Sequence, residues 1–284
     1  MLVLLPQEII RDTTSEIMNT VNDFAYLDTE TARQKYKLGK DVRDWTVAWA
    51  QKDLITSQLC PEKIIPINYR PFDVRYTYYT GKSKGFHCYP RHETMKHFID
   101  RDNFGLLLCK QFKAFPEYHH IFICNNCFES SIVSNKTSEI SYGFPLYIYE
   151  DLDNSRHPNF NNEIIQKFAK GLQLKFTEEK TDEKNTFAPI DVLDYIYAIL
   201  HSPKYRETYK EFLKIDFPKV PYPTDTIKFW KLVKLGSKIR LIHSLKSNEL
   251  NTLIIGYPIS GDNIVTKLTF NDGKVYINDT QYFD

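Results

Sequence analysis

The chain has 284 residues, of which 42% are hydrophobic, and its 37 basic and 36 acidic side chains leave a net charge of +1. This length allows one large or two small domains with a substantial core. No apolar run approaches the ~20 residues that cross a bilayer, and five scattered cysteines do not indicate a secreted disulfide framework. We therefore expect a cytoplasmic protein with no membrane partner.

Residues 1–60 are predicted to be mainly helical. Thr13 and Glu16 have the spacing of a capping box, and apolar residues recur at helical intervals as far as Phe24. A second helix is expected over about residues 44–57. Its apolar stripe is expected to comprise Trp45, Trp49 and Leu54.

Residues 61–150 are predicted to form a β-rich lobe. β-Branched and aromatic residues alternate between Ile64 and Tyr79, where Pro66 and Pro71 restrict the strands to edges or breaks. A short helix is expected at 91–101, and further strands at 105–109, 121–124, 132–133 and 144–149. The expected fold class is mixed α/β, with a mixed, twisted sheet whose variable loops are suited to carry binding side chains.

The stretch from Asn68 to Lys113 concentrates positive charge. It contains nine Lys/Arg against four Asp/Glu, a local net charge of +5 in a chain whose total is +1. These cations lie among tyrosine and phenylalanine residues, and that combination suits a polyanion that also presents flat rings. A solvated charged loop beside a tyrosine-rich core strand has the same composition, so composition alone leaves both interpretations open.

Residues 151–188 are predicted to form a connector, because the centre of this stretch, 177–185, consists largely of charged residues that favour exposure to solvent. A helix is a possibility at 163–170. Residues 189–284 are then predicted to form a helical lobe closed by a β-hairpin. Helix starts are expected at Pro189, at Ser202-Pro203 and at Thr224 or Asp225.

The last part of the chain is predicted to be β-structure. Strands are expected at 253–257, 264–270 and 274–277. Asp272-Gly273 is typical of a tight hairpin turn and is expected to join the last two strands.

Motifs for catalysis are absent from the sequence or weak. It contains neither the Asn/Asp-Pro-Pro-Tyr/Phe motif of adenine-N6 methyltransferases nor the Gly-x4-Gly-Lys-Ser/Thr motif of ATP sites. The acid-x-Lys triplets at 178–180 and 182–184 are what a charged stretch produces by composition, although a nuclease metal site would use such residues. Cys124-x-x-Cys127 near His119-His120 lacks the second ligand pair of a structural zinc site, so we expect buried thiols and no metal.

Several motifs carry a resemblance to a known family. The first is Tyr69-Arg70-Pro71-Phe72-Asp73-x-Arg75 followed by Tyr78-Tyr79, and the most specific runs from Tyr195 to Pro218 and begins Tyr-Ile-Tyr-Ala-Ile-Leu-His-Ser-Pro. Further matching stretches are 41–45, 91–97, 144–149 and 229–245. In this order they resemble the segment after the methyltransferase core in Type ISP and related fused Type II restriction-modification enzymes. The resemblance covers roughly residues 41–283.

This resemblance implies a DNA target recognition domain that gives sequence specificity to an adenine-N6 methyltransferase and nuclease. The implied partners are double-stranded DNA and the methyltransferase core of the same parent polypeptide, to which residues 1–60 would form a bridge. The parent would use S-adenosylmethionine, Mg²⁺ and ATP, whereas we expect no catalytic residue and no cofactor in this piece of it. A protein-interaction module that docks through its Tyr/Phe surface and a metal-dependent nuclease fragment are the alternatives.

Two groups of residues are candidates for contacting DNA. Phosphates are expected to be bound by cations of the basic stretch, with Tyr78 as an aromatic contact. These cations are Arg70, Arg75, Lys82, Lys84 and Arg91. Bases are expected to be read from two loops, because Gln and Asn can pair with adenine and Lys with guanine. The loop candidates are Lys110, Gln111, Lys113, Ser134, Asn135 and Lys136. Arg70 is also close enough to Asp73 to pair with it, which would make Arg70 structural.

Overall fold

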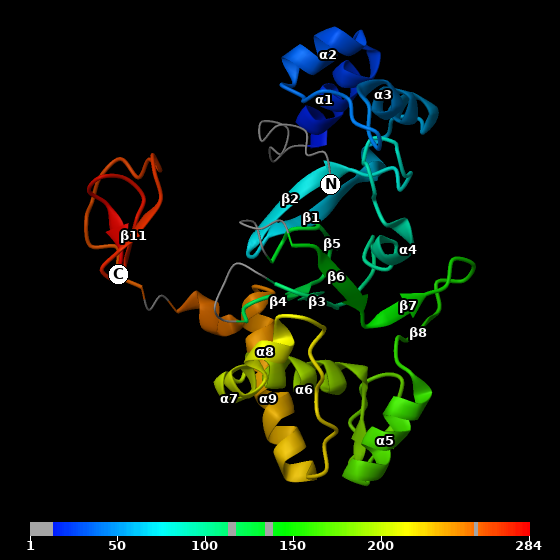
Figure 1. Ribbon diagram of the computed structural model, residues 1–284, viewed down its shortest axis with the longest axis vertical. Helices are drawn as coiled ribbons and strands as arrows, with labels where there is room; N and C mark the ends of the chain where they lie inside the picture. Colours follow the sequence, from blue (N-terminus) through cyan, green and yellow to red (C-terminus); the bar gives the residue numbers. More distant parts are fainter. Residues whose placement is uncertain (1–13, 113–117, 134–138, 253–254) are drawn as a thin grey trace. The chain divides into compact units, whose positions relative to one another are not determined.

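The computed structural model describes residues 14–112, 118–133, 139–252 and 255–284. Contacts within the chain divide it into two compact units, Met1–Ser244 (unit 1) and Leu245–Asp284 (unit 2). Figure 1 labels most of the helices and strands. None of the helices in the described ranges is both long and apolar enough to cross a membrane.

The first described elements of unit 1 are three helices, α1 (Thr14–Tyr26), α2 (Thr29–Lys35) and α3 (Val47–Thr56), so the described part of 1–60 is mainly helical, as predicted. The Asp28 carboxylate caps α2, and the Thr46 hydroxyl caps α3 by accepting from the Trp49 N–H at 3.1 Å. α3 begins at Val47, later than expected, so Trp45 of the predicted stripe precedes the helix, although it is buried. The buried residues of α3 are Val47, Ala50, Gln51, Asp53 and Leu54. Trp49 is 39% exposed, which corrects its predicted place in the apolar stripe.

The following strands form small sheets in place of one continuous sheet. β1 (Ile64–Arg70), which follows the 3-10 turn η2 (Pro61–Lys63), pairs antiparallel with β2 (Asp73–Tyr78) and parallel with β5 (Cys127–Phe128). β3 (Gly105–Cys109) pairs antiparallel with β4 (Ile121–Cys124) on one side and β6 (Ser141–Pro145) on the other. β7 (Tyr147–Tyr149) pairs with β8 (Arg156–Pro158). The mixed α/β class is confirmed, whereas 132–133 is a turn and the helix expected at 91–101 is only α4 (His92–Met95).

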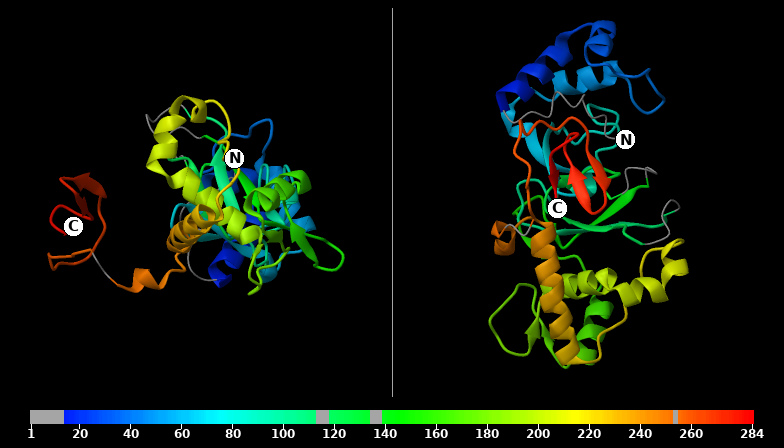
Figure 2. Two further views of the ribbon diagram at one scale, coloured as in Figure 1. Left: turned by 90° about the horizontal axis from the view of Figure 1, so that it is seen from below. Right: turned by 90° about the vertical axis from the view of Figure 1, so that its left-hand side faces the viewer.

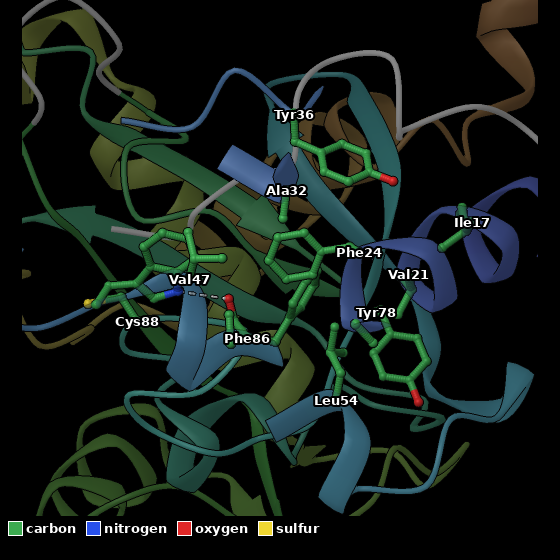
Figure 3. Close-up of a cluster of buried hydrophobic side chains, with 13 residues drawn as sticks. Ile17, Val21, Phe24, Ala32, Tyr36, Val47, Leu54, Tyr78, Phe86 and Cys88 are labelled. Carbon is green, nitrogen blue, oxygen red and sulfur yellow. Dashed lines mark hydrogen bonds between the residues drawn. The ribbon is translucent and has the colours of Figure 1, made fainter. Parts of the chain in front are cut away.

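The N-terminal helices share a hydrophobic core with the end of β2 and the loop that follows it. Figure 3 shows Phe24 of α1 and Leu54 of α3 near Tyr78 of β2 and Phe86 of the loop. The Trp45 indole N–H donates to the Phe86 carbonyl at 3.3 Å. The loop after β2 is therefore fixed at Phe86 by the core beneath it.

A helical part completes unit 1. Its elements are α5 (Asn162–Leu172), β9 (Lys175–Phe176), β10 (Thr186–Phe187), α6 (Pro189–His201), α7 (Pro203–Thr208), α8 (Lys210–Leu213) and α9 (Thr226–His243). The helices expected from Pro189 and from Asp225 are confirmed, and the one expected from Pro203 is divided at Tyr209. Within the predicted connector the charged residues 178–185 are exposed, but Phe168 and Phe187 lie in the core with Phe229 of α9.

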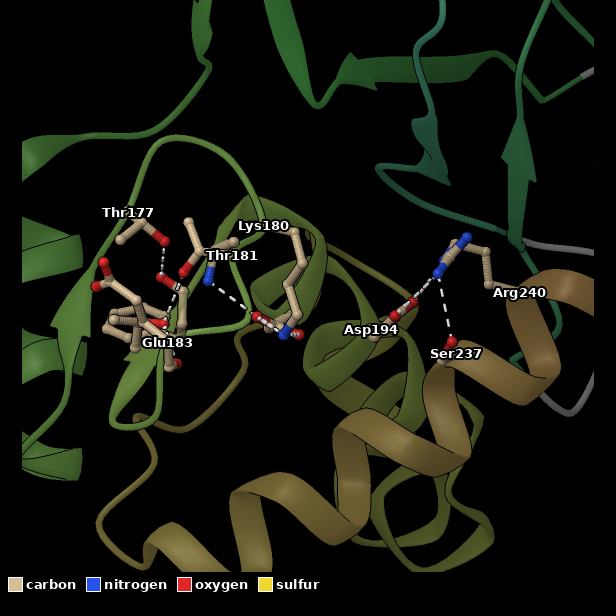
Figure 4. Close-up of polar contacts among 11 residues, drawn as sticks. Thr177, Lys180, Thr181, Glu183, Asp194, Ser237 and Arg240 are labelled. Carbon is tan, nitrogen blue, oxygen red and sulfur yellow. Dashed lines mark hydrogen bonds and ion pairs between the residues drawn. The ribbon is translucent and has the colours of Figure 1, made fainter.

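Helices α6 and α9 cross at very close range. A Cβ atom added to Gly236 of α9 would lie 1.8 Å from the backbone carbonyl oxygen of Asp194 of α6, so only glycine permits this approach. One turn further along, the Arg240 guanidinium donates to both carboxylate oxygens of Asp194, at 2.6 and 3.1 Å. Figure 4 shows this pair together with Ser237. These contacts fix which face of α9 is turned towards α6.

Unit 2 consists of the turn η3 (Asn248–Asn251) and a three-stranded antiparallel sheet in the order β11 (Thr269–Asn271), β12 (Lys274–Tyr276), β13 (Tyr282–Phe283). The predicted hairpin is confirmed: Asp272 and Gly273 both have positive φ angles, of 51° and 75°. The strand expected at 264–270 is reduced to β11, and 255–257 is not a strand. The only apolar side chain buried among the described residues of this unit is Ile277.

Candidate nucleic-acid interface

Two of the predicted phosphate-binding residues stack on one tyrosine of the β1–β2 hairpin. The guanidinium carbons of Arg70 and Arg75 lie 4.0 and 4.1 Å from the centre of the Tyr69 ring. Arg70 donates to the Glu129 carboxylate at 2.7 Å, and Arg75 donates to Asp73 at 2.8–3.0 Å. The expected pairing of Arg70 with Asp73 is therefore wrong, because Asp73 is the partner of Arg75.

These ion pairs limit what the hairpin can offer a polyanion. Glu129 is 7% exposed and is further held by the N–H of Ser131 and the hydroxyl of Ser130. A phosphate that binds Arg70 or Arg75 must therefore compete with a carboxylate that is already in place. The two arginines stay candidates for DNA contact, but both also have a structural role, which the sequence suggested for Arg70 with a different partner.

Tyr78 is placed in the core instead of on the surface. Its side chain is 1% exposed, and its hydroxyl accepts a hydrogen bond from the Cys60 N–H at 3.1 Å. Burial also raises its pKa, so the hydroxyl stays protonated. This position corrects the expectation that the Tyr78 ring contacts DNA.

The loop after β2 exposes the next two candidates, Lys82 and Lys84, from a fixed backbone. The carboxylate of Asp53, in α3 and 2% exposed, accepts from the Thr80 hydroxyl at 2.6 Å and from the Phe86 N–H at 2.8 Å. It thus ties together the two ends of the segment that carries both lysines. The ammonium of Lys84 lies 5.7 Å from the centre of the Trp49 ring.

A further cation and ring lie on the same loop. Arg91 is exposed, and its guanidinium lies 5.6 Å from the ring of Tyr89, which is 38% exposed. Gly81 packs on the ring of His92, so the chain at Lys82 runs beside the chain at Arg91. We call this group of exposed residues the α3-loop surface. It comprises Trp49, Lys82, Lys84, Tyr89 and Arg91.

Sequence reasoning found the cations of the α3-loop surface but missed its rings. The signal for Tyr89 was its position two residues before Arg91 in a loop. The signal for Trp49 was the apolar stripe of Val47, Ala50 and Leu54, three and four residues apart, which leaves Trp49 on the opposite side of α3. Arg43 is also exposed nearby, but Asp44 accepts from it at 2.8 Å, and this ion pair holds the pKa of Asp44 below its usual value.

The predicted base-reading residues are only partly described. Lys110 and Gln111 are exposed directly after β3. They therefore belong to the β4–β3–β6 sheet and not to the sheet that leads into the α3-loop surface. Lys113, Ser134, Asn135 and Lys136 lie outside the described residues.

The described residues do not support a zinc site or a metal-dependent nuclease. Cys124 and Cys127 are buried, as expected, and burial raises the pKa of Cys127 to about 12. No group of three potential metal ligands occurs in the described part of the chain. Within the acid-x-Lys triplet at 178–180, Glu179 pairs with Arg156 and Lys180 pairs with Asp191, both at 2.7 Å. These residues have structural partners where a nuclease would need them free.

The positioning of the α3-loop surface can be tested at Gly85. A Cβ atom at this residue would lie 2.3 Å from the Asp53 carboxylate oxygen. We expect Gly85→Ala to displace that carboxylate, to lower the free energy of unfolding by about 1–3 kcal/mol, and to speed proteolysis between Thr80 and Cys88. Gly39→Ala is the matched control, because nothing lies within 4 Å of the added atom. Equal proteolysis of both variants would show that Asp53 does not hold the loop.

Comparison with known proteins completes the description. A family model described as the Type ISP C-terminal specificity domain matches residues 9–284. No curated protein matches the chain. Three solved structures, described next, have a similar fold. This chain covers 17% of the first protein, 24% of the second and 21% of the third, which is about a fifth of their length.

The first is the ATP-dependent Type ISP restriction-modification enzyme LlaBIII bound to DNA, with 18% identity and a TM-score of 0.62 over 94% of this chain. The second is a nuclease-deletion mutant of the Type ISP enzyme LlaGI in complex with a DNA substrate mimic, with 17% identity and a TM-score of 0.57 over 95% of this chain. The third is a DrdV–DNA complex, with 20% identity and a TM-score of 0.55 over 81% of this chain. At these identities the likeness shows the fold alone.

Proposed function

The chain belongs to the family of Type ISP C-terminal specificity domains, and from this premise we propose that it recognises a target sequence in double-stranded DNA. It would do so as part of a longer cytoplasmic restriction-modification polypeptide whose methyltransferase core and nuclease carry out the chemistry. S-adenosylmethionine, Mg²⁺ and ATP would bind those other parts.

The observation that carries the proposal is the α3-loop surface. Within the described residues, Lys82, Lys84 and Arg91 form no salt bridge, unlike Arg70 and Arg75, although the charge of Lys84 is close enough to Asp44 to help lower the pKa of that carboxyl. Their charges are thus available to displace counterions from DNA, and the exposed rings of Trp49 and Tyr89 can pack on sugars. Because Asp53 fixes the loop, little ordering entropy is lost on binding.

Sequence selection would come from other loops. Phosphate contacts position a protein on DNA without specifying bases, so the α3-loop surface would set the register. Gln111 and Lys110 are the described candidates for base contacts, since Gln pairs with adenine and Lys with guanine in the major groove. The candidates at 113 and 134–136 keep the same proposed role.

Charge reversal in the α3-loop surface tests the proposal. We expect Lys82→Glu/Lys84→Glu to weaken binding to duplexes of several unrelated sequences alike, by at least roughly tenfold at ~0.1 M salt. The slope of log K against log salt should fall by about 2, one phosphate contact for each lysine. Fluorescence anisotropy with labelled duplexes measures both quantities.

The charge-conserving variant Lys82→Arg/Lys84→Arg is the control and should keep the affinity. A loss confined to one DNA sequence would mean that these lysines read bases. Affinity that stays the same in the Glu variant would remove the α3-loop surface from the interface.

A protein-binding role is the second candidate, and the observation that favours it is in unit 2. Phe270, Val275 and Phe283 are cross-strand neighbours on one face of its sheet and are 74%, 41% and 40% exposed. Tyr257 stacks on Phe283 with a centroid distance of 4.7 Å. Unit 2 has three lysines against five acids. An exposed apolar face on a unit with more acids than lysines suits protein better than DNA, and the parent polypeptide could supply such a partner.

A further inference from the structure

Helix α9 carries a row of lysines and no acidic residue. Its sequence, TIKFWKLVKLGSKIRLIH, contains Lys228, Lys231, Lys234 and Lys238, all of which are exposed. At 3.6 residues per turn they fall within an arc of about 120° on one side of the helix. The buried residues Phe229, Val233, Gly236 and Arg240 occupy the opposite side.

The packing of α9 prevents this row from turning inward. Gly236 is in contact range of the Asp194 backbone, and Arg240 is tied to the Asp194 carboxylate, so the helix cannot rotate about its axis. In the right-hand view of Figure 2, α9 is the long orange helix at the front of the helical part of unit 1. Because these core contacts fix the rotation of α9, its lysine side faces outward.

Three of these charges, those of Lys228, Lys231 and Lys234, are not neutralised by the described residues of unit 1. In the described ranges, Lys228, Lys231 and Lys234 form no ion pair, whereas Lys214 pairs with Glu211 on the neighbouring α8. Three uncompensated ammonium groups at this spacing repel one another. Exposure to solvent requires polar residues on this side of α9, but it does not require that all of them carry the same charge, and an anionic partner accounts for the single sign.

The spacing of the row fits a linear polyanion. From Lys228 to Lys238 the helix rises by about 15 Å. One strand of DNA presents a phosphate every 3.4 Å or so along the duplex axis, so the row can face several phosphates of one strand. Ile227 and Leu235, 71% and 56% exposed among the lysines, can lie against the sugars between them.

We infer that the lysine side of α9 is a second, sequence-independent binding site for the phosphate backbone of duplex DNA, separate from the α3-loop surface. The inference rests on the proposed DNA-binding function and names another element that carries it. Neither the base-reading candidates nor the basic stretch at 68–113 includes α9, and the sequence predicts the helices of 189–245 to be a scaffold that touches DNA only through exposed Lys/Arg.

The experiment compares two triple variants of the full chain with equal changes in charge. Lys228→Gln/Lys231→Gln/Lys234→Gln removes the α9 row. The control, Lys170→Gln/Lys175→Gln/Lys204→Gln, removes three exposed lysines from α5, β9 and α7. Binding to a labelled duplex of mixed sequence is measured between roughly 50 and 200 mM salt. We expect the α9 variant to bind at least roughly tenfold more weakly at 0.1 M salt, with a salt slope reduced by about 2 to 3, and the control to keep both.

Each outcome decides the inference. Equal affinities and slopes for the α9 variant and the control overturn it and leave the proposed function standing. If the unmodified chain binds no duplex at any salt, the proposed function fails, and the inference fails with it. If the α9 variant loses binding to an acidic polypeptide such as polyglutamate but still binds the duplex, the row binds an acidic protein. This result also overturns the inference. The Lys→Arg triple variant must retain binding, which excludes an effect of misfolding.

Discussion

Replacing Arg240 by methionine should lower the free energy of unfolding of unit 1 by about 3–5 kcal/mol. Asp194 is 2% exposed and Arg240 is 7% exposed, and each satisfies the charge of the other inside the core. Burial already raises the pKa of Asp194, and the hydrogen bonds from Arg240 oppose that rise. Without the guanidinium the carboxylate is buried alone or must take up a proton. Urea denaturation followed by circular dichroism measures the loss.

The effect should depend on pH with a defined sign. Without Arg240 the pKa of folded Asp194 lies further above that of the unfolded chain, so the folded state binds the extra proton. The stability lost by the variant is therefore smallest below the unfolded pKa of about 4 and grows as the pH rises through the folded pKa. The double variant Asp194→Leu/Arg240→Met buries no charge and should lose far less than the single variant. Equal losses would show that the ion pair is not the cause.

The parts of the fold that are determined by residues close together in the sequence were predictable. Pro189 and Asp225 mark where α6 and α9 begin, and apolar residues three and four apart mark their buried faces. Asp272-Gly273 specifies its turn because both residues tolerate positive φ. These signals act over a few residues, so a single sequence contains them in full.

Contacts between distant residues were not predictable in the same way. Glu129 lies 59 positions from Arg70, and nothing near Arg70 indicates that it has this partner rather than Asp73. Along β2 the alternation makes Val74 and Tyr76 exposed, and it would also expose Tyr78. Tyr78 is buried because the N-terminal helices cover that end of the strand. The alternation of side chains along β2 was predicted correctly, but the residues that bury Tyr78 come from elsewhere in the chain.

The candidate site shows the same division. The cations of the α3-loop surface follow from the local charge of the sequence, and their exposure agrees with it. The anchor that holds them, Asp53, is 27 positions before Thr80 and looks like any polar residue of a helix. The row on α9 was visible in the sequence as four lysines, but its significance required knowing that Gly236 and Arg240 face inward.

Acidification should destabilise unit 1 through the buried imidazole of His87. This side chain is 0% exposed, and its Nε2 lies 3.1 Å from the Thr77 hydroxyl, while its Nδ1 has no hydrogen-bond partner in the described structure. Burial lowers its pKa to about 4. In the unfolded chain a histidine takes up a proton near pH 6.5. Between these values the unfolded state binds one proton more than the folded state, so stability falls as the pH falls.

The expected size follows from proton linkage. One such histidine changes the free energy of unfolding by about 1.4 kcal/mol per pH unit within this interval. Its contribution is fully present above about pH 6.5 and is lost towards pH 4. His201, whose pKa burial also lowers to about 4, adds a slope of its own over the same interval. Urea denaturation at several pH values between about 5 and 6.5 measures the slope without titrating most carboxylates.

The variant His87→Gln isolates the contribution of His87, because glutamine can still bond Thr77 and does not titrate. We expect its slope to be lower than that of the unmodified chain by about 1.4 kcal/mol per pH unit, whatever its absolute stability. Phe86→Leu is the matched control: Phe86 is 2% exposed and packs on His87, so its loss lowers stability at every pH and leaves the slope unchanged. An unchanged slope in His87→Gln would mean that the buried imidazole gains its proton at the same pH in both states, as it would if water reached Nδ1 through the loop after β2.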